Sequence, residues 1–233
     1  METRSEVDRL QEVYHEYAVR GFGQSKWSPA NKGNQAIWDE CHGKLRVLLR
    51  RAGFFPLEAR RILDVGCGGG EHLAAFEAWG ARPENLFGVD LILDRIRLAQ
   101  QNHPRLTFKL GNAEALPFAE GAFDLVTVFT VFSSILDGRM AAKVGREIVR
   151  VLASGGAVIW YDFRMRSPLN RHVRGISRRR IQGLFPGFKM SLETLSLLPP
   201  LARRLGALTH LLYAPLSSVP FLRSHYLGIL TKP

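Results

Sequence analysis

The stretch ILDVGCGGG, from Ile62 to Gly70, is a short apolar run with one acidic residue that breaks into four glycines within five positions. Glycine lacks a Cβ, so backbone N–H groups in a glycine turn approach a ligand that a side chain would hold away. In an open parallel sheet, ligands bind outside the carboxyl ends of the strands. The stretch therefore predicts a cofactor-binding turn directly after a strand.

A dinucleotide-binding turn, one candidate for this stretch, follows the pattern G-x-G-x-x-G. Counted from Gly66, the last position of that pattern is Glu71 instead of glycine. An acidic side chain there repels a pyrophosphate, so nicotinamide and flavin dinucleotides are disfavoured.

We interpret Cys67 as a small residue that fits the turn rather than as a reactive thiol. Asp64 has an alternative role as the cap of the following helix.

The elements that must position this turn are apolar runs that alternate with helical patterns. Runs that are apolar throughout are typical of parallel strands buried on both faces. They lie at residues 61–65, 86–90, 106–110, 123–129 and 157–163. Helical periodicity separates them at about 70–79, 92–102 and 138–152. The alternation predicts an α/β fold with a doubly wound sheet.

Further elements flank this core on both sides. Apolar residues at helical spacing predict two N-terminal helices, at residues 6–19 and 35–51. Two more strands are expected at residues 188–195 and 221–230, running antiparallel to each other. The leucine-rich stretch between these strands starts at Pro199 and is expected to include a helix. We therefore expect seven strands, mostly parallel, with an antiparallel strand at the C-terminal end.

Length and composition are those of one elaborated domain. The chain has 233 residues, of which 46% are hydrophobic, and it can bury a sizeable core. Its two cysteines have no metal-site or disulfide spacing, and no cluster of carboxylates at the strand ends demands a metal. Charged residues follow Met1 at once, without an apolar signal-peptide core, so we expect a cytoplasmic protein.

The positive charge of the chain is concentrated in its C-terminal part. The net charge is +11, and residues 139–233 carry 16 Lys or Arg against 3 Asp or Glu. Such asymmetry indicates a surface that meets something anionic, unless it is only a solvated basic face. Arginines are dense between residues 164 and 180, and arginine suits phosphate groups. Aromatic residues interleaved for base stacking are missing from that run, which disfavours nucleic acid.

Eighteen residues without a formal charge lie between Arg204 and Arg223. The length is close to that of a membrane span, but Pro215 and Pro220 and several polar residues argue against one. We interpret the stretch as an apolar cover over a substrate pocket, with peripheral membrane contact as the alternative.

The glycine stretch resembles the E/D-x-G-x-G-x-G signature of class I S-adenosylmethionine-dependent methyltransferases. Asp64 takes the acidic position, and Gly66, Gly68 and Gly70 take the glycine positions, with Cys67 between them. The resemblance implies that these five residues bind S-adenosylmethionine. This cofactor carries positive charge and no phosphate, so an acidic neighbour is tolerated.

Later segments match the same family in the expected order. Asp90 stands 20 residues after Gly70. In the family, a carboxylate at this place accepts hydrogen bonds from both ribose hydroxyls of the cofactor, and the resemblance implies that Leu91 lies against the adenine. GNAEALPF, residues 111–118, is similar to the family's G-D-A-x-x-L-P-F segment, and it implies adenine contacts for Asn112 and Ala113. Asn112 departs from the usual acidic residue, because it keeps an acceptor oxygen but loses the charge.

The segments FDLV, residues 123–126, and REI, residues 146–148, continue the resemblance, and Ala153–Ser154 stand where the family usually has proline. Phe129, at the end of the fourth strand, completes the implied cofactor-binding set. Over residues 60–163 the chain is similar to the type 11 methyltransferases, which include ubiquinone and menaquinone methyltransferases. The resemblance implies a Rossmann-like, seven-stranded fold and methyl transfer.

The acceptor side is expected at the ends of the fourth and fifth strands. The N/D-P-P-Y motif for nucleobase and amide nitrogen is absent, and Ser133–Ser134 stand where many relatives have a histidine pair. Asp162 is the candidate base for a hydroxyl acceptor, and Tyr161 or Arg164 is the candidate that orients it. The alternative for Asp162 is an ion pair with Arg164 or Arg166.

Together these features predict a methyltransferase domain over residues 56–233, with a cofactor half at 60–163 and an acceptor-side segment at 164–233. Residues 1–55 are expected to form a helical cap. We expect O-methylation of a small molecule, such as a sugar or glycan intermediate or a specialised metabolite, with a phosphate-bearing acceptor as one option. An RNA methyltransferase and a cofactor-binding scaffold without catalysis are the alternatives.

Overall fold

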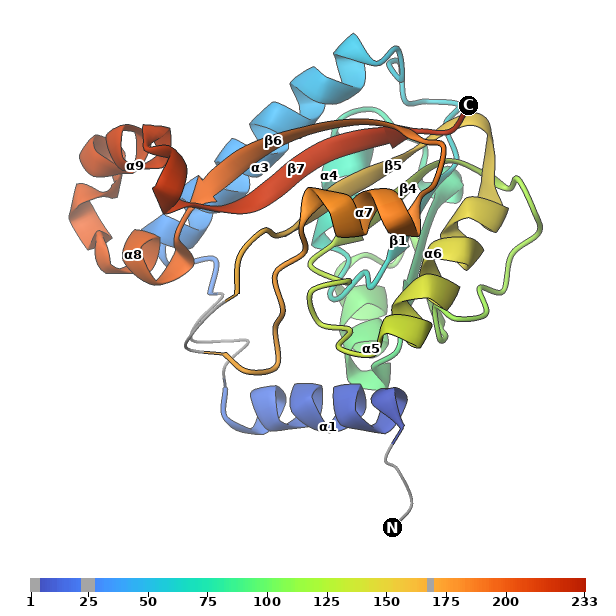
Figure 1. Ribbon diagram of the computed structural model, residues 1–233, viewed down its shortest axis with the longest axis horizontal. Helices are drawn as coiled ribbons and strands as arrows, with labels where there is room; N and C mark the ends of the chain where they lie inside the picture. The colour runs from blue at the N-terminus through green and yellow to red at the C-terminus, as the bar shows by residue number, and fades with distance from the viewer. Residues whose placement is uncertain (1–4, 22–27, 167–169) are drawn as a thin grey trace.

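The computed structural model describes residues 5–21, 28–166 and 170–233, and its strands form one seven-stranded sheet (Figure 1). The order across the sheet is β3-β2-β1-β4-β5-β7-β6. β1 to β5 are parallel, and β7 is antiparallel to both of its neighbours. The strands are β1 (Ile62–Val65), β2 (Leu86–Asp90), β3 (Thr107–Leu110), β4 (Phe123–Phe129), β5 (Leu152–Phe163), β6 (Lys189–Leu197) and β7 (Arg223–Thr231). The expected α/β sheet with its antiparallel C-terminal strand is confirmed.

Helices cover both faces of this sheet. One face is buried by α6 and α7, whose apolar residues join Val126, Val158 and Trp160 in one cluster. α1 lies across the end of the sheet and adds Leu10 to this cluster (Figure 1). The other face is buried by α3, α4 and α5, which pack on Ile62 and Leu125. The bounds are α1 (Glu6–Val19), α3 (Lys32–Arg51), α4 (Glu71–Ala78), α5 (Leu93–Asn102), α6 (Gly138–Val151) and α7 (Arg178–Leu184). Because helices lie on both faces, the carboxyl edge of the sheet is the open side for a ligand.

Two elements begin earlier than the sequence predicted. α3 begins at Lys32 rather than at residue 35, because the side chain of Asn31 accepts hydrogen bonds from the N–H groups of Gly33 and Asn34. β5 begins at Leu152 rather than at residue 157, directly where α6 ends. Leu152 pairs with Phe123 before the register shifts to Ala157 and Leu125. An irregularity in the ladder therefore extends β5 beyond its apolar run.

The segment between β6 and β7 forms a separate lobe, residues 199–222, which we call the C-terminal lobe. It holds α8 (Pro199–Arg204), α9 (Thr209–Ser218) and the short 3-10 helices Gly206–Leu208 and Pro220–Leu222. Figure 1 shows α8 and α9 beyond the ends of β6 and β7, at the same side as one end of α3. A small apolar cluster of Ile37, Leu197, Ala202 and Tyr213 joins the lobe to α3 and β6. No helix among the described residues is long and apolar enough to cross a membrane.

Candidate cofactor and acceptor site

The glycine turn lies directly after β1, and at Gly66 and Gly70 it is packed too closely for a side chain. Gly66, Gly68 and Gly70 have φ angles of 73°, 55° and 87°, which lie in the left-handed region that favours glycine. A Cβ on Gly66 would lie 2.8 Å from Cγ2 of Val131, beyond the end of β4. The N–H groups of Gly66 and Cys67 both donate to the carbonyl of Val89 on β2. The turn is therefore held between the ends of β2 and β4.

Asp64 lies behind this turn and is completely buried. Its Oδ1 accepts a hydrogen bond of 2.5 Å from the hydroxyl of Thr127 on β4. Its Oδ2 has no hydrogen-bond partner among the described residues. Burial raises the pKa of Asp64 to about 7, and the negative charges of Asp90 and Glu71 add to that rise. The residue does not cap the next helix, because the cap of α4 is Gly70.

Asp90, the last residue of β2, fixes the turn from the other side. Its Oδ2 accepts the N–H of Gly68 at 2.9 Å, and its Oδ1 accepts the N–H of Ile92 at 2.9 Å. Cys67 is buried beneath the turn, and burial raises the pKa of its thiol. That direction agrees with a packed, unreactive thiol. Leu91 is half-buried at the start of the loop that follows.

The loop after β3 is held by α6. Asn112 closes a local turn, since its Oδ1 accepts the N–H of Glu114 at 2.9 Å. Ala113 is half-buried beside it. Glu147 on α6 accepts the N–H of Leu116 at 2.7 Å, and Arg150 donates to the carbonyls of Leu116 and Phe118. Glu147 lies in the REI segment, but no local pattern marks its contact or those of Arg150, because these contacts are tertiary.

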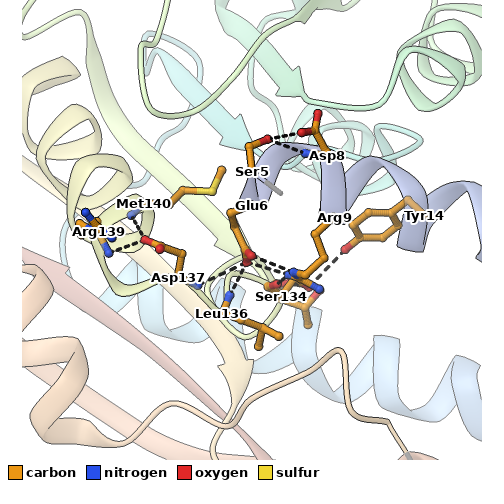
Figure 2. A network of polar contacts seen from close by, with 11 residues as sticks. Ser5, Glu6, Asp8, Arg9, Tyr14, Ser134, Leu136, Asp137, Arg139 and Met140 are labelled. Atoms are coloured by element: carbon orange, nitrogen blue, oxygen red, sulfur yellow. Dashed lines mark hydrogen bonds and ion pairs between the residues drawn. The ribbon is translucent and has the colours of Figure 1, made fainter. Parts of the chain in front are cut away.

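The helix α1 is fastened to the loop after β4, as Figure 2 shows. Glu6 accepts the N–H of Leu136 at 2.6 Å, and Arg9 donates to the carbonyl of Ser134 at 2.6 Å. The hydroxyl of Tyr14 lies 3.2 Å from the hydroxyl of Ser134. Burial works against the charge on Glu6, but the hydrogen bonds from Arg9 and Leu136 outweigh it and lower the pKa of Glu6. The carboxylate of Glu6, which holds α1 to the loop after β4, is therefore charged at neutral pH.

An arginine joins this helix to the glycine turn. The guanidinium of Arg95, on α5, lies 4.3 Å from the centre of the Tyr14 ring. Its Nη1 lies 3.7 Å from the point where a Cβ on Gly68 would be. α1, α5 and the glycine turn thus meet at one place, at the carboxyl edge of the sheet.

A stack of rings that the sequence analysis missed lies on the other side of β4. The ring of His72 is stacked on Phe129, with centroids 3.6 Å apart, and on Trp38, at 4.8 Å. Nδ1 of His72 lies 3.0 Å from Nε2 of His42. Burial lowers the pKa of both histidines, for His42 to about 4, so both are neutral at pH 7. Trp38 and His42 lie four residues apart on α3, a spacing that places them on one face.

Asp162 and Tyr161, the predicted catalytic pair, are adjacent on β5 and make separate contacts. Asp162 is 1% exposed, and its oxygens accept the N–H groups of Ser133 at 2.9 Å and Phe163 at 2.8 Å. Burial raises its pKa to about 6. The hydroxyl of Tyr161 lies 2.8 Å from that of Ser196. Neighbouring residues of a strand point to opposite faces, so the two side chains are not brought together.

The ion pair that was the alternative role for Asp162 is not formed among the described residues. Arg164 instead donates from Nε to the carbonyl of Arg223 at 2.8 Å.

Thr130, the first residue after β4, has a φ of 55°, which is unusual for a residue with a branched side chain. Its N–H donates to the carbonyl of Tyr161 at 2.7 Å. Strain of this kind gathers at functional sites.

Comparison with known proteins gives the following similarities. Residues 63–160 match the family Methyltransf_11, described as a methyltransferase domain. A fatty-acid O-methyltransferase of Mycolicibacterium smegmatis is 35% identical over 130 residues, which cover 55% of this chain and 46% of that protein. A demethylmenaquinone methyltransferase of Roseiflexus castenholzii is 34% identical over 130 residues, covering 54% of this chain and 52% of that protein. The chain thus spans about half the length of these curated relatives.

Among solved structures, the [4+2]-cyclase SpnF superposes with a TM-score of 0.69 at 18% identity, covering 96% of this chain and 97% of that one. At that identity the likeness shows the fold alone. The likeness extends over nearly the whole chain.

Proposed function

We propose that this chain, whose residues 63–160 are a methyltransferase domain of the Methyltransf_11 family, transfers a methyl group from S-adenosylmethionine to an oxygen of a small, largely apolar acceptor. The family expected from the sequence is confirmed. The observation that carries the proposal is Asp64, a buried carboxylate behind a turn of left-handed glycines, one of whose oxygens has no partner in the described part of the chain. A buried charge without a partner is costly, so the site is suited to a ligand that brings a positive charge or a donor.

The residues present fit S-adenosylmethionine. A Cβ on Gly68 would meet nothing nearer than Nη1 of Arg95 at 3.7 Å, so the bare backbone of the turn is open to a methionine group there, and Asp64 supplies an acceptor and a negative charge. Both carboxylate oxygens of Asp90 accept one backbone N–H each and retain lone pairs for the ribose hydroxyls. When bound, the cofactor supplies a methyl group on a positively charged sulfur.

The adenine side of the proposed site departs from the sequence expectation at Asn112. Its Oδ1 already accepts the N–H of Glu114, and the amide donates to the Glu114 carboxylate at 3.2 Å. We propose that Asn112 shapes the adenine loop, while Leu91 and Ala113 supply apolar contact. Phe129 is 6% exposed and stacked on His72. We propose that its ring forms one side of the cofactor site and separates the cofactor from α4.

The N-terminal cap acts here as a lid that excludes water. Polar contacts of Glu6, Arg9 and Tyr14 hold α1 on the loop after β4. Leu10, on the same helix, is buried in the core. Methyl transfer to a weak oxygen nucleophile depends on holding acceptor and methyl in line. A lid fixed by three polar contacts provides that alignment by restricting how the acceptor lies.

The apolar acceptor is proposed from the relatives and from the rings near the turn. The names of the relatives refer to O-methylation of a fatty acid and to a demethylmenaquinone, and both of these molecules have a large apolar body. Trp38, at 37% exposure, offers apolar surface, and it is stacked on His72, two residues after the glycine turn. The sugar or glycan acceptor expected from the sequence stays a prediction, as does a phosphate on it.

Asp162 as the base also stays a prediction. Its oxygens accept two backbone N–H groups, which supports a positioning role in which it joins the end of β5 to Ser133. A carboxylic acid acceptor is ionised at neutral pH and needs no base, so the proposed function does not depend on Asp162.

Calorimetric titration with S-adenosylmethionine and S-adenosylhomocysteine tests the cofactor site. At about pH 8, where Asp64 is mostly ionised, the parent chain should bind both. Asp64→Asn keeps the shape but removes the charge, and it should weaken binding at least about tenfold, the scale of a hydrogen bond to a charged group. Asp94→Asn, on the exposed side of α5, is the matched control and should bind as the parent does. A parent chain that binds neither compound would contradict the proposal.

The acceptor class is tested by transfer of a labelled methyl group. Long-chain fatty acids, reduced quinones and sugar phosphates are each incubated with the protein and the labelled cofactor. Methylation of a fatty acid or quinol, without methylation of sugar phosphates, is the expected result. Labelling of sugar phosphates alone would replace the apolar acceptor with the sugar predicted from the sequence.

A further inference from the structure

The C-terminal lobe has an outer face that is apolar where a solvated helix carries charge. Leu208, Leu211 and Phe221 are 54%, 61% and 73% exposed. Leu208 and Leu211 are three residues apart where the 3-10 helix leads into α9, so they lie side by side. The sequence has no charged residue between Arg204 and Arg223. A surface helix normally places charged and polar residues on its outer face, so this face is suited to a partner that is itself apolar.

The inner face of the lobe is closed, which shows that the exposed leucines are not left over from loose packing. The hydroxyl of Tyr213 donates to Glu40 on α3 at 2.7 Å. Ala202 is fully buried, and a Cβ on Gly33 of α3 would lie 2.1 Å from its carbonyl oxygen. Asn31 donates to the carbonyl of Arg203 at 3.3 Å. The lobe is fixed on α3, and its apolar residues are presented outward by a rigid support.

The charged residues of the lobe itself have one sign. They are Arg203 and Arg204 at the end of α8, and Arg223 follows the lobe as the first residue of β7. The neighbouring carboxylate of Glu40, on α3, accepts the hydroxyl of Tyr213 on the inner face. Arg204 is exposed at the end of α8. An apolar patch bordered by cations, with no anion in its own segment, complements a surface that combines apolar material with negative charge.

A bilayer containing anionic lipid has both properties. A second copy of this chain fits less well, because a two-fold interface brings the same patch against itself and would face arginines with arginines. Three exposed apolar side chains are also few for an interface that typically buries about 800 Å² on each partner. The observations therefore favour a lipid surface as the occupant.

The lobe lies at the edge of the sheet that carries the candidate site. Phe163, the last residue of β5, pairs with His225, and Leu197, the last residue of β6, pairs with Arg223. The carboxyl ends of both strands therefore meet the start of β7, directly beside the lobe (Figure 1). A surface that binds the lobe would face the same edge as the glycine turn.

We propose that the C-terminal lobe docks this protein on the surface of anionic lipid bilayers. Leu208, Leu211 and Phe221 enter the region between headgroups and acyl chains, and Arg204 faces the lipid phosphates and carboxylates. The inference rests on the lobe alone and does not require the proposed methyl transfer.

Sedimentation of the full chain with lipid vesicles, without cofactor, tests the docking. The protein should sediment with vesicles of phosphatidylcholine that contain about one third phosphatidylserine, and much less with phosphatidylcholine alone. The double variant Leu208→Ser and Leu211→Ser should bind at least about tenfold more weakly, because it removes apolar surface that enters the bilayer. The matched control is Val47→Ser with Leu98→Ser, at 46% and 47% exposure on α3 and α5, and it should bind as the parent does.

Arg204→Gln tests the electrostatic part. Binding to the anionic vesicles should weaken roughly fivefold, the scale of one basic residue near a charged membrane. Arg46→Gln, exposed on α3, serves as the control and should change nothing. Thermal unfolding of all variants establishes that each is folded.

Three outcomes would overturn the inference: no sedimentation with anionic vesicles, equal binding of the double serine variant and the parent, or a dimer that the double serine variant dissolves. The last outcome, measured by light scattering on a size-exclusion column, would assign the patch to a second copy of the chain.

Discussion

The ends of β1 and β5 each hold a buried aspartate as the penultimate residue of the strand, and the two carboxylates are used differently. Both oxygens of Asp162 accept backbone N–H groups, so its local hydrogen-bond needs are met by the protein. Asp64 receives one hydrogen bond, from Thr127, and keeps one oxygen without a partner among the described residues. Burial alone therefore does not identify a binding residue. A buried oxygen that lacks a hydrogen-bond donor, as in Asp64, is the better sign.

The comparison predicts that loss of Asp162 costs stability. Asp162→Ala leaves the N–H groups of Ser133 and Phe163 without their acceptor in a dry environment. We expect the free energy of unfolding to fall by about 3 kcal/mol, measured by urea denaturation. Asp124→Ala is the control, because its partly exposed carboxylate also accepts a backbone N–H, from Arg61, and it should cost about 1 kcal/mol.

A folded, stable Asp162→Ala protein that has lost turnover but retains cofactor binding would break the comparison. That result would support Asp162 as the base rather than as a structural link between β5 and the loop after β4.

The pH dependence of stability should distinguish Asp64. Its pKa is raised from an ordinary 3.8 to about 7, so the folded chain prefers the protonated form. The contribution of Asp64 to the free energy of unfolding is therefore fully present below about pH 4 and is lost as the pH rises to about 7. Between about pH 5 and about pH 8, the parent should lose about 2 kcal/mol of stability relative to Asp64→Asn, which cannot ionise. Guanidinium denaturation at both pH values measures this, and parallel pH profiles of the two proteins would contradict it.

Thr127 offers a smaller, sharper test of the same site. Thr127→Val removes the only hydrogen bond to Asp64 among the described residues, with little change of shape. We expect a loss of about 1 kcal/mol at about pH 8, where Asp64 is charged, and less at low pH. Thr127→Ser keeps the hydroxyl and is the control, although its smaller side chain costs some packing. Equal losses for the valine variant at both pH values would show that packing, rather than the hydrogen bond, is what Thr127 supplies.

Much of the fold could be predicted from local sequence. The bounds of β2 and β4 match the expected strands residue for residue, because each is a short, largely apolar run. The early start of β5 could not be predicted in the same way, since its first residues are paired through a register shift that only the neighbouring strand determines.

The site was predictable where one segment supplies both the backbone and the chemistry. The glycine turn is local, whereas the contacts of Arg150 and the stack of His72 on Phe129 join distant segments and left no local signal. Tyr161 and Asp162 are a different case. Strand alternation alone places adjacent residues on opposite faces, so their joint action on one acceptor could have been doubted from the sequence.

The stack of Trp38 on His72 also gives the protein an optical reporter. Trp38 is the partly exposed indole of the stack, and His72 stands two residues after the last glycine of the turn. The indole of Trp160, by contrast, is fully buried against Phe132. We expect a ligand on the glycine turn to change the surroundings of Trp38, and through His42 those of Trp79, while Trp160 is unaffected, so that intrinsic fluorescence reports binding without an added label.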